Sequence, residues 1–252
     1  MAPSKSVVDF AFRTPVYKGL ALLESRLSLP AMSQPAEHNE HNETPESARK
    51  ADAPIRIEKD AIAALPLGQW EGKIVMVEHP DDVAPAVAKL MKERVLGFDT
   101  ETKPNFKPGG NNFPSLVQLA GKDTVYLFRL DDCGGIPGLF PIFRDAKILK
   151  VGVAVKDDVK NLKDRAPFRD AGFVEISDFT RKAGIENTGL RALVAHYLGM
   201  RISKGAQVTN WAAKHLTPVQ VTYAATDAWV SRELYVKLEE LAVIPVKGGK
   251  HA

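Results

Sequence analysis

Acidic side chains stand where two apolar stretches of this 252-residue sequence end. Asp99 and Glu101 follow the stretch Val95–Phe98, and Asp158 follows a second one. Alternate residues of a β-strand point to the same face, so Asp99 and Glu101 would share one face at a strand end. Two like charges there are unfavourable unless a cation lies between them. Each acid also has an ordinary interpretation: the strand pair could face water, and Asp158 or its neighbour Asp157 could cap a helix.

A tyrosine and a fourth acid lie one helical turn apart near the C-terminal end of the sequence. Tyr223 and Asp227 would therefore share one face of a helix. Small residues surround them, which lets a helix approach another element closely, although an exposed acid on a solvated face remains the alternative. With the other three acids, Asp227 could complete an oxygen-rich cluster of the kind that binds Mg²⁺ or Mn²⁺. Two such ions about 4 Å apart can clamp the attacking and leaving oxygens of a phosphodiester.

Three motifs in this order resemble those of the DEDD superfamily of 3′–5′ exonucleases, in its tyrosine subclass. That subclass covers ribonuclease D and the exonuclease domain of the Werner syndrome helicase. The motifs are Phe98–Thr102, Val151–Asp158 and Tyr223–Ala228, and the resemblance spans roughly residues 70–241. The histidine subclass would place a histidine where this sequence has Thr222. One departure is Asp157, where the family usually has glycine or a similar residue, so that two adjacent acids compete for the second-motif position. The six-residue step from Gly152 and the position of Leu162, four residues on, favour Asp158.

The resemblance implies a ribonuclease-H-like fold and a metal-dependent active site. It implies that Asp99, Glu101, Asp158 and Asp227 bind two divalent ions, Mg²⁺ or Mn²⁺, and that Tyr223 orients or helps deprotonate the attacking water. The implied activity is hydrolysis of the terminal phosphodiester of DNA or RNA, which releases nucleoside monophosphates. Two alternatives stay open: a nuclease for small oligoribonucleotides, and a non-catalytic nucleic-acid-binding module on the same fold.

Residues that could contact the substrate are less sharply defined by the sequence. Thr100 and Thr102 flank the first two acids and could meet the terminal nucleotide. Lys204 and Asn210 lie in a polar stretch before the last helix and could contact the strand.

Hydrophobic periodicity predicts an α/β domain with a mixed sheet of five to six strands and helices on both faces. The predicted strands are 74–78, 95–101, 115–120, 124–128, 148–155 and 173–176. The predicted helices are 81–93, with Asp81 or Asp82 as cap, 157–164, 188–198 and 217–241, with Thr217 as cap. Residues 55–246 are expected to form this exonuclease-like domain. Residues 1–54, which are polar over much of their length, are expected to be a mobile arm and linker, and residues 247–252 a tail.

Composition limits the partners and compartments that suit this protein but identifies none of them. The net charge of +3 is compatible with nucleic acid as the partner, as a single strand or a 3′ end, but does not require it. No apolar run approaches the length that crosses a bilayer, so no membrane partner is expected. A single cysteine, Cys133, excludes an internal disulfide framework and suits a reducing intracellular compartment. The cytoplasm or nucleus is expected, with an organelle and a homo-oligomer left open.

Overall fold

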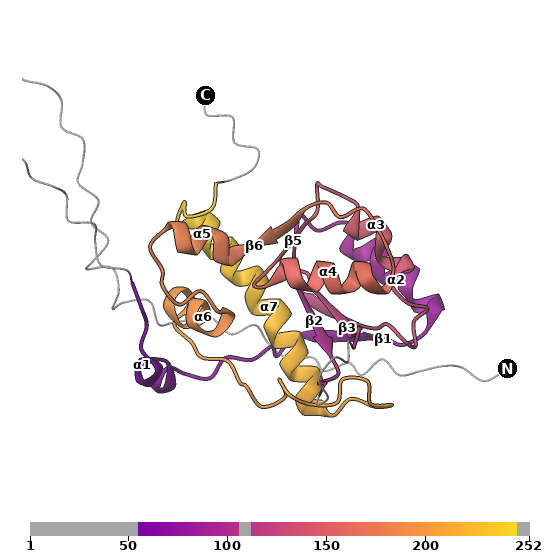
Figure 1. The fold of residues 1–252 in the computed structure, drawn as a ribbon, viewed down its shortest axis with the longest axis horizontal. Coiled ribbons are helices and arrows are strands. Elements are labelled where there is room, and N and C mark those ends of the chain that lie inside the picture. Colours follow the sequence, from indigo (N-terminus) through magenta and orange to yellow (C-terminus); the bar gives the residue numbers. More distant parts are fainter. Residues whose placement is uncertain (1–54, 106–111, 246–252) are drawn as a thin grey trace, which may run out of the picture. The chain divides into compact units, whose positions relative to one another are not determined.

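A six-stranded mixed sheet forms the centre of the domain (Figure 1). The computed structural model describes residues 55–105 and 112–245. The strand order is β1-β4-β3-β2-β5-β6. The strands are β1 (Lys73–Val77), β2 (Val95–Thr102), β3 (Pro114–Ala120), β4 (Thr124–Arg129), β5 (Leu149–Gly152) and β6 (Phe173–Glu175). The predicted mixed sheet is therefore confirmed, with six strands.

Both kinds of pairing occur in the sheet. The central strands β2, β3 and β4 form an antiparallel meander, whereas β1, β5 and β6 are added in parallel at its two sides. Because β2 and β5 run parallel, their C-terminal ends lie at the same edge of the sheet. At that edge β2 carries Asp99 and Glu101 near its end, and the chain after β5 leads to Asp157 and Asp158.

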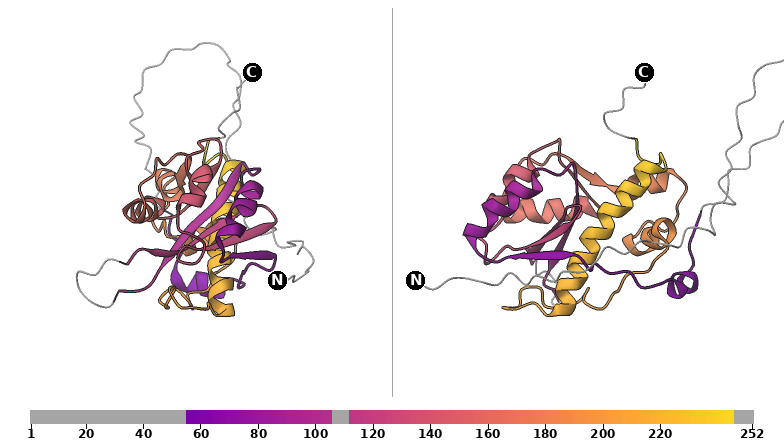
Figure 2. Two further views of the ribbon diagram at one scale, coloured as in Figure 1. Left: turned by 90° about the vertical axis from the view of Figure 1, so that its right-hand side faces the viewer. Right: turned by 180° about the vertical axis from the view of Figure 1, so that it is seen from behind.

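Helices cover both faces of the sheet (Figure 2). One face carries α2 (Pro80–Leu90), the short η2 (Pro137–Leu139) and α3 (Phe140–Phe143), and α4 (Val155–Arg165). The other carries α5 (Ile176–Lys182), α6 (Leu190–Leu198) and the long α7 (Pro218–Glu240), which crosses the strands. A further short helix, α1 (Lys59–Ala64), precedes β1 and buries none of its side chains.

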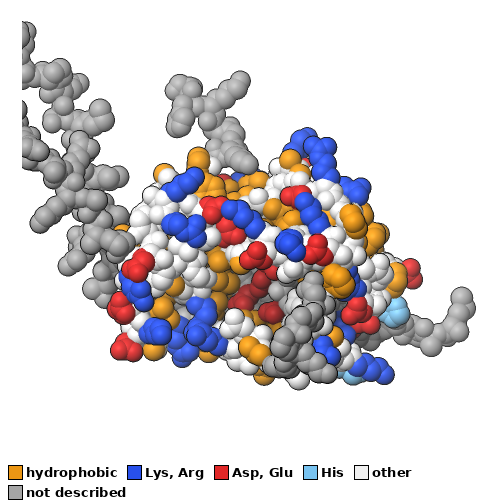
Figure 3. Space-filling view, viewed as in Figure 1, with side chains coloured by type: hydrophobic (Ala, Val, Ile, Leu, Met, Phe, Trp, Pro, Cys, Tyr) orange, Lys and Arg blue, Asp and Glu red, His pale blue; other side chains and the backbone are white. Residues whose placement is uncertain are grey.

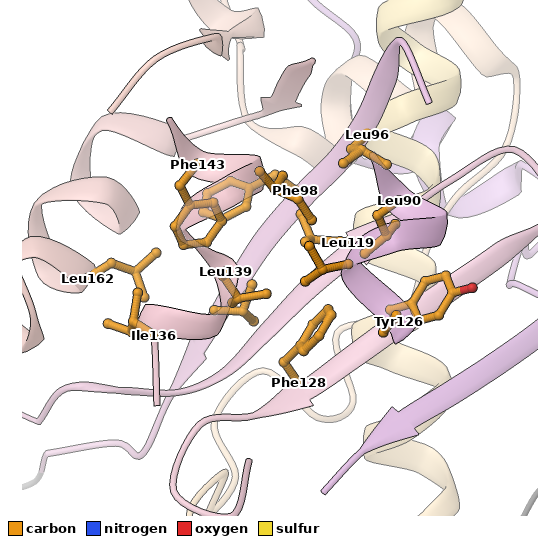
Figure 4. Packing of buried hydrophobic residues seen from close by; sticks show 14 of the residues in the cluster. Leu90, Leu96, Phe98, Leu119, Tyr126, Phe128, Ile136, Leu139, Phe143 and Leu162 are labelled. Atoms are coloured by element: carbon orange, nitrogen blue, oxygen red, sulfur yellow. The ribbon is translucent and has the colours of Figure 1, made fainter. Parts of the chain in front are cut away.

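The largest hydrophobic cluster of the described residues fills the space between the sheet and the helices α2, α3 and α4 (Figure 4). Phe98 of β2 packs edge-on against Phe143 of α3, with their ring centroids 6.3 Å apart. Alternation along β2 places Phe98 in this core, and it turns the neighbouring Gly97 and Asp99 to the face of α7. The core thereby determines which side of the sheet receives the acids.

Some predicted boundaries were wrong. The predicted strand 148–155 ends at Gly152 because Ala154 takes a left-handed conformation (φ 66°), and Val155 already begins α4. Asp81 and Asp82 do not cap α2; His79 holds the cap position and Pro80 begins the helix. The helices α1, α3 and α5 are too short to show clear periodicity and were not predicted.

The predictions for residues 1–54 and 247–252 fall outside the described residues. The predicted limits of the domain, residues 55–246, remain a prediction. Within the described segments, no helix combines the length and the apolar character that a membrane span requires.

Candidate active site

Strand β2 carries two acids on the side that faces α7. The neighbouring Gly97 lies so close to α7 that an added Cβ would stand 1.8 Å from the carbonyl oxygen of Ala228. Only glycine allows this approach. Asp99 and Glu101 follow at alternate positions on the same face, and the strand pairing becomes irregular after Glu101. The close packing at Gly97 thus brings the end of β2 against the middle of the long helix.

Helix α7 supplies the third acid and the tyrosine. A capping box between Thr217 and Gln220, with Pro218 at the first helical position, sets the start of the helix. Asp227 is buried, and Tyr223 lies one turn before it, half-buried. Carboxylate oxygens of Asp99, Glu101 and Asp227 lie within 4.8 Å of one another.

Helix α4 brings the fourth acid to the edge of this group. Asp158 lies in the first turn of α4 and accepts a hydrogen bond of 2.6 Å from the hydroxyl of Thr100. It does not cap the helix; the carboxylate of Glu175 accepts from the first backbone N–H groups instead. Asp157 is exposed. The structure therefore directs Asp158 to the cluster and Asp157 to solvent.

Burial makes all four acids reluctant to ionise, and repulsion by neighbouring carboxylates adds to this effect at Asp99, Glu101 and Asp158. Burial raises the pKa of Asp99, and the charge of Asp227 raises it further. The pKa of Glu101 is raised by burial and by the other three carboxylates. The pKa of Asp158 is raised by burial and by Asp99, while the Thr100 hydroxyl opposes the shift. Burial also raises the pKa of Asp227, against the hydrogen bond from Tyr223 and the charge of Arg191.

The Tyr223 hydroxyl is held in its protonated form. Burial raises its pKa above the ordinary value for a phenol, and the charges of Asp227 and Glu101 raise it further. The protonated phenol lies one helical turn from Asp227 and lowers the pKa of that acid. This geometry favours the orienting role among the two that the family resemblance implies.

The donor set fits divalent metal ions. None of the four carboxylates forms an ion pair with a lysine or arginine within the described residues. Buried acids that raise one another's pKa without such a partner favour a bound cation. All the donors are carboxylate oxygens, which suit hard divalent cations.

The four residues predicted to contact substrate lie in different surroundings. The Thr100 hydroxyl is engaged with Asp158. Thr102 is half-buried at the end of β2. Asn210 is exposed, and its side-chain oxygen accepts from the backbone N–H of Ala212 at 3.2 Å. Lys204 is exposed on the loop after α6, beside other basic residues.

Sequence reasoning missed Arg191, on α6. Its charge lowers the pKa of the buried Asp227, so the guanidinium lies within electrostatic reach of the acids. Figure 3 shows acidic side chains in a hollow of this face, with lysine and arginine side chains gathered beside it. No motif marks Arg191, because its relation to Asp227 exists only through the packing of α6 on α7.

Comparisons with known proteins agree with this geometry. A family model described as "3'-5' exonuclease" matches residues 74–242. The mouse (Mus musculus) bifunctional 3'-5' exonuclease/ATP-dependent helicase WRN is 30% identical over 187 residues. The match covers 70% of this chain and 13% of that protein, so the chain corresponds to a small part of its relative.

Two solved structures share the fold. The Nibbler EXO domain of Aedes aegypti superposes with a TM-score of 0.61 at 24% identity, covering 74% of this chain and 91% of that one. Ribonuclease D of Escherichia coli superposes with a TM-score of 0.60 at 22% identity, covering 69% of this chain and 47% of that one. These likenesses support the ribonuclease-H-like fold of the described domain.

Proposed function

The chain belongs to the 3′–5′ exonuclease family of the DEDD superfamily, and from this premise we propose that it removes nucleotides from the 3′ end of a nucleic acid strand. The observation that carries the proposal is the convergence of Asp99, Glu101 and Asp227 within 4.8 Å, with Asp158 at its edge. In the proposed reaction, water attacks the terminal phosphodiester. The 3′ oxygen of the preceding nucleotide leaves, and a nucleoside monophosphate is released.

Family membership implies dependence on a divalent metal, and we propose two Mg²⁺ or Mn²⁺ ions held by the four carboxylates. Bound there, the ions would supply positive charge to the attacking and leaving oxygens of the phosphodiester. The chain contributes the arrangement of the carboxylates. Gly97 lets β2 approach α7, and Thr100 fixes the orientation of Asp158. These contacts hold β2 against α7 and fix Asp158 before substrate arrives.

Tyr223 is proposed to orient the attacking water. Its hydroxyl stays protonated, and the residue lies one turn before Asp227 on α7, which places it beside the cluster. Thr102, Lys204 and Asn210 are proposed to contact the strand, and Thr100 to contribute through Asp158. The partner is DNA or RNA with a free 3′ end. We place the activity in the cytoplasm or nucleus, because the one cysteine, Cys133, suits a reducing compartment.

The test uses 5′-labelled single-stranded DNA and RNA with Mg²⁺, Mn²⁺ or EDTA. A ladder that shortens from the 3′ end, requires metal and is absent with Asp99→Asn supports the proposal. The strand that is shortened identifies the substrate class. Asp157→Asn serves as the matched control, because that acid is exposed beside Asp158 and should leave the ladder unchanged. Binding of the strand without cleavage under any metal would refute the exonuclease and favour a binding module.

A further inference from the structure

A small pocket beside α6 is lined mainly by basic side chains. Its volume is about 300 Å³, and its lining residues are Lys59, Ile62, Ala63, Arg191, Arg201 and Lys204. No acid lines it. None of its four cations forms an ion pair with an acid of segments 55–105 and 112–245. Four like charges around one pocket repel one another, so the pocket favours an anion.

Backbone carbonyls orient the two arginines. Arg191 donates from Nε to the carbonyl of Ile202 at 3.2 Å, and Arg201 donates from Nε to the carbonyl of Leu65 at 3.0 Å. Each bond holds one edge of a guanidinium and leaves its two terminal nitrogens for another acceptor. A guanidinium presented in this way suits the paired oxygens of a phosphate.

The segment that carries Lys59 is attached at both ends. Before α1, the backbone of Ile55 bonds to Gly184 at 2.8 Å and accepts from Glu186 at 2.9 Å. After α1, Arg201 exchanges backbone bonds with Pro66 and Gly68 at 2.9 and 2.8 Å. Yet α1 buries no side chain, so packing in the core does not explain its position. Its evident contribution is a wall of the basic pocket, and it lies outside the segment 74–242 that matches the family.

The pocket and the carboxylate cluster lie on two helices that pack on each other. Helix α6, which carries Arg191, packs on α7, which carries Asp227. The space-filling view shows lysine and arginine side chains gathered beside the hollow that holds acidic side chains (Figure 3). A strand whose terminal phosphodiester lay at the acids would therefore pass a cationic pocket close by.

We propose that the pocket lined by Lys59, Arg191, Arg201 and Lys204 binds one backbone phosphate of the nucleic acid strand engaged at the carboxylates. This proposal rests on the function proposed above and extends it to a site that α1 completes. The pocket would hold the strand by charge and reads no base, because its only other lining residues are apolar.

The experiment measures binding of a 5′-fluorescein-labelled single strand by anisotropy in EDTA, where hydrolysis is stopped, over a series of salt concentrations. The variant is Lys59→Gln/Lys204→Gln, since both lysines are exposed and neither makes a hydrogen bond within the described residues that the change would break. The matched control is Lys89→Gln/Lys122→Gln, which removes two exposed lysines from α2 and the β3–β4 turn. Loss of one phosphate contact should weaken binding about tenfold at low salt and reduce the salt slope by about 0.7, whereas the control should match the wild type.

An unchanged slope in the pocket variant, or an equal loss in the control, would overturn the proposal. Metal-dependent cleavage by the wild-type protein is measured in parallel. Cleavage with an unchanged slope refutes the pocket alone and leaves the exonuclease standing. A reduced slope without cleavage by the wild type supports the pocket and refutes the exonuclease. A wild-type protein that neither binds nor cleaves refutes both.

Discussion

Replacing Asp99 by asparagine should stabilise the metal-free protein while it abolishes hydrolysis. The substitution keeps the shape of the side chain and an oxygen that can accept from the backbone N–H of Thr100, a bond of 2.9 Å in the structure. It removes one negative charge from a buried group of acids. Stability and activity should therefore change in opposite directions at a single residue.

The structure sets the magnitude. Two unit charges at the 4.8 Å that bounds this group repel by about 3.5 kcal/mol at an effective dielectric constant of 20. Glu101 and Asp227 both repel Asp99 in this way, but the acids do not all ionise together, so we expect a smaller net gain of about 2 kcal/mol. For a domain of this size that gain corresponds to an increase in Tm of about 4 to 8 °C.

The gain in stability from Asp99→Asn should increase as the pH rises. Burial first, and the charge of Asp227 second, raise the pKa of Asp99 to about 8 in the folded protein. An acid whose folded pKa is raised contributes stability below its unfolded pKa of about 3.9, and this contribution is lost as the pH rises through the folded value. The stability of the wild type in EDTA should thus fall between about pH 4 and pH 8. Asp99→Asn should match it near pH 4 and exceed it near pH 8.

Thermal unfolding in EDTA, from pH 4 to pH 9, checks this prediction, with Asp157→Asn as the control at an exposed acid. Saturating Mg²⁺ should stabilise the wild type by a few kcal/mol near pH 8, and Asp99→Asn much less, because ion binding adds stability only where the ligands remain. Hydrolysis by the variant should fall by at least about 100-fold, since even outer-sphere partners of a metal are worth about 10- to 100-fold. If Asp99→Asn lowered the Tm near pH 8, or raised it equally at pH 4, the account of repelling buried carboxylates would be refuted.

Three further changes test other parts of the site. Asp158→Asn should lose hydrolysis and raise the Tm in EDTA near pH 8. Asp157→Asn should keep hydrolysis and change stability by less than about 0.5 kcal/mol. Equal effects of the two variants in melting and ladder assays would contradict the assignment of Asp158 to the site. Tyr223→Phe should reduce hydrolysis about 10- to 100-fold with little change in Tm. Because its hydroxyl lowers the pKa of Asp227, the acidic limb of the rate profile should move to higher pH; an unmoved limb would argue against that effect. Gly97→Ala should destabilise the protein by about 3 kcal/mol in denaturant unfolding, because its Cβ would collide with the α7 backbone, and Gly189→Ala, which has open space, should be nearly neutral.

Local spacing alone determined the pairs of functional residues. Asp99 and Glu101 share a face because a strand repeats every second residue, and Tyr223 and Asp227 share one because a helix repeats every turn. The start of α7 at Pro218, after the cap Thr217, follows from interactions within a few residues. Such features depend on short-range geometry, and the sequence displays them directly. The family resemblance then supplied the order in which the pairs are combined.

Tertiary structure decided how these pairs meet. The distance from β2 to α7 depends on Gly97 lying against Ala228, a contact between segments far apart in the chain. The choice of Asp158 over Asp157 depends on β5 ending early and on the left-handed Ala154, which sets the rotation of α4. Sequence periodicity does not carry either fact, because both arise from packing between elements and not within them.

The basic pocket is the feature that the sequence alone could predict least. Its cations come from α1, α6 and the loop after α6, and neither a motif nor a regular spacing relates them. They meet because backbone bonds tie residues 55–68 to Gly184, Glu186 and Arg201. A single surface charge forms a binding site only when the fold brings other charges close to it. Because these residues are far apart in the sequence, only the tertiary structure decided that they meet.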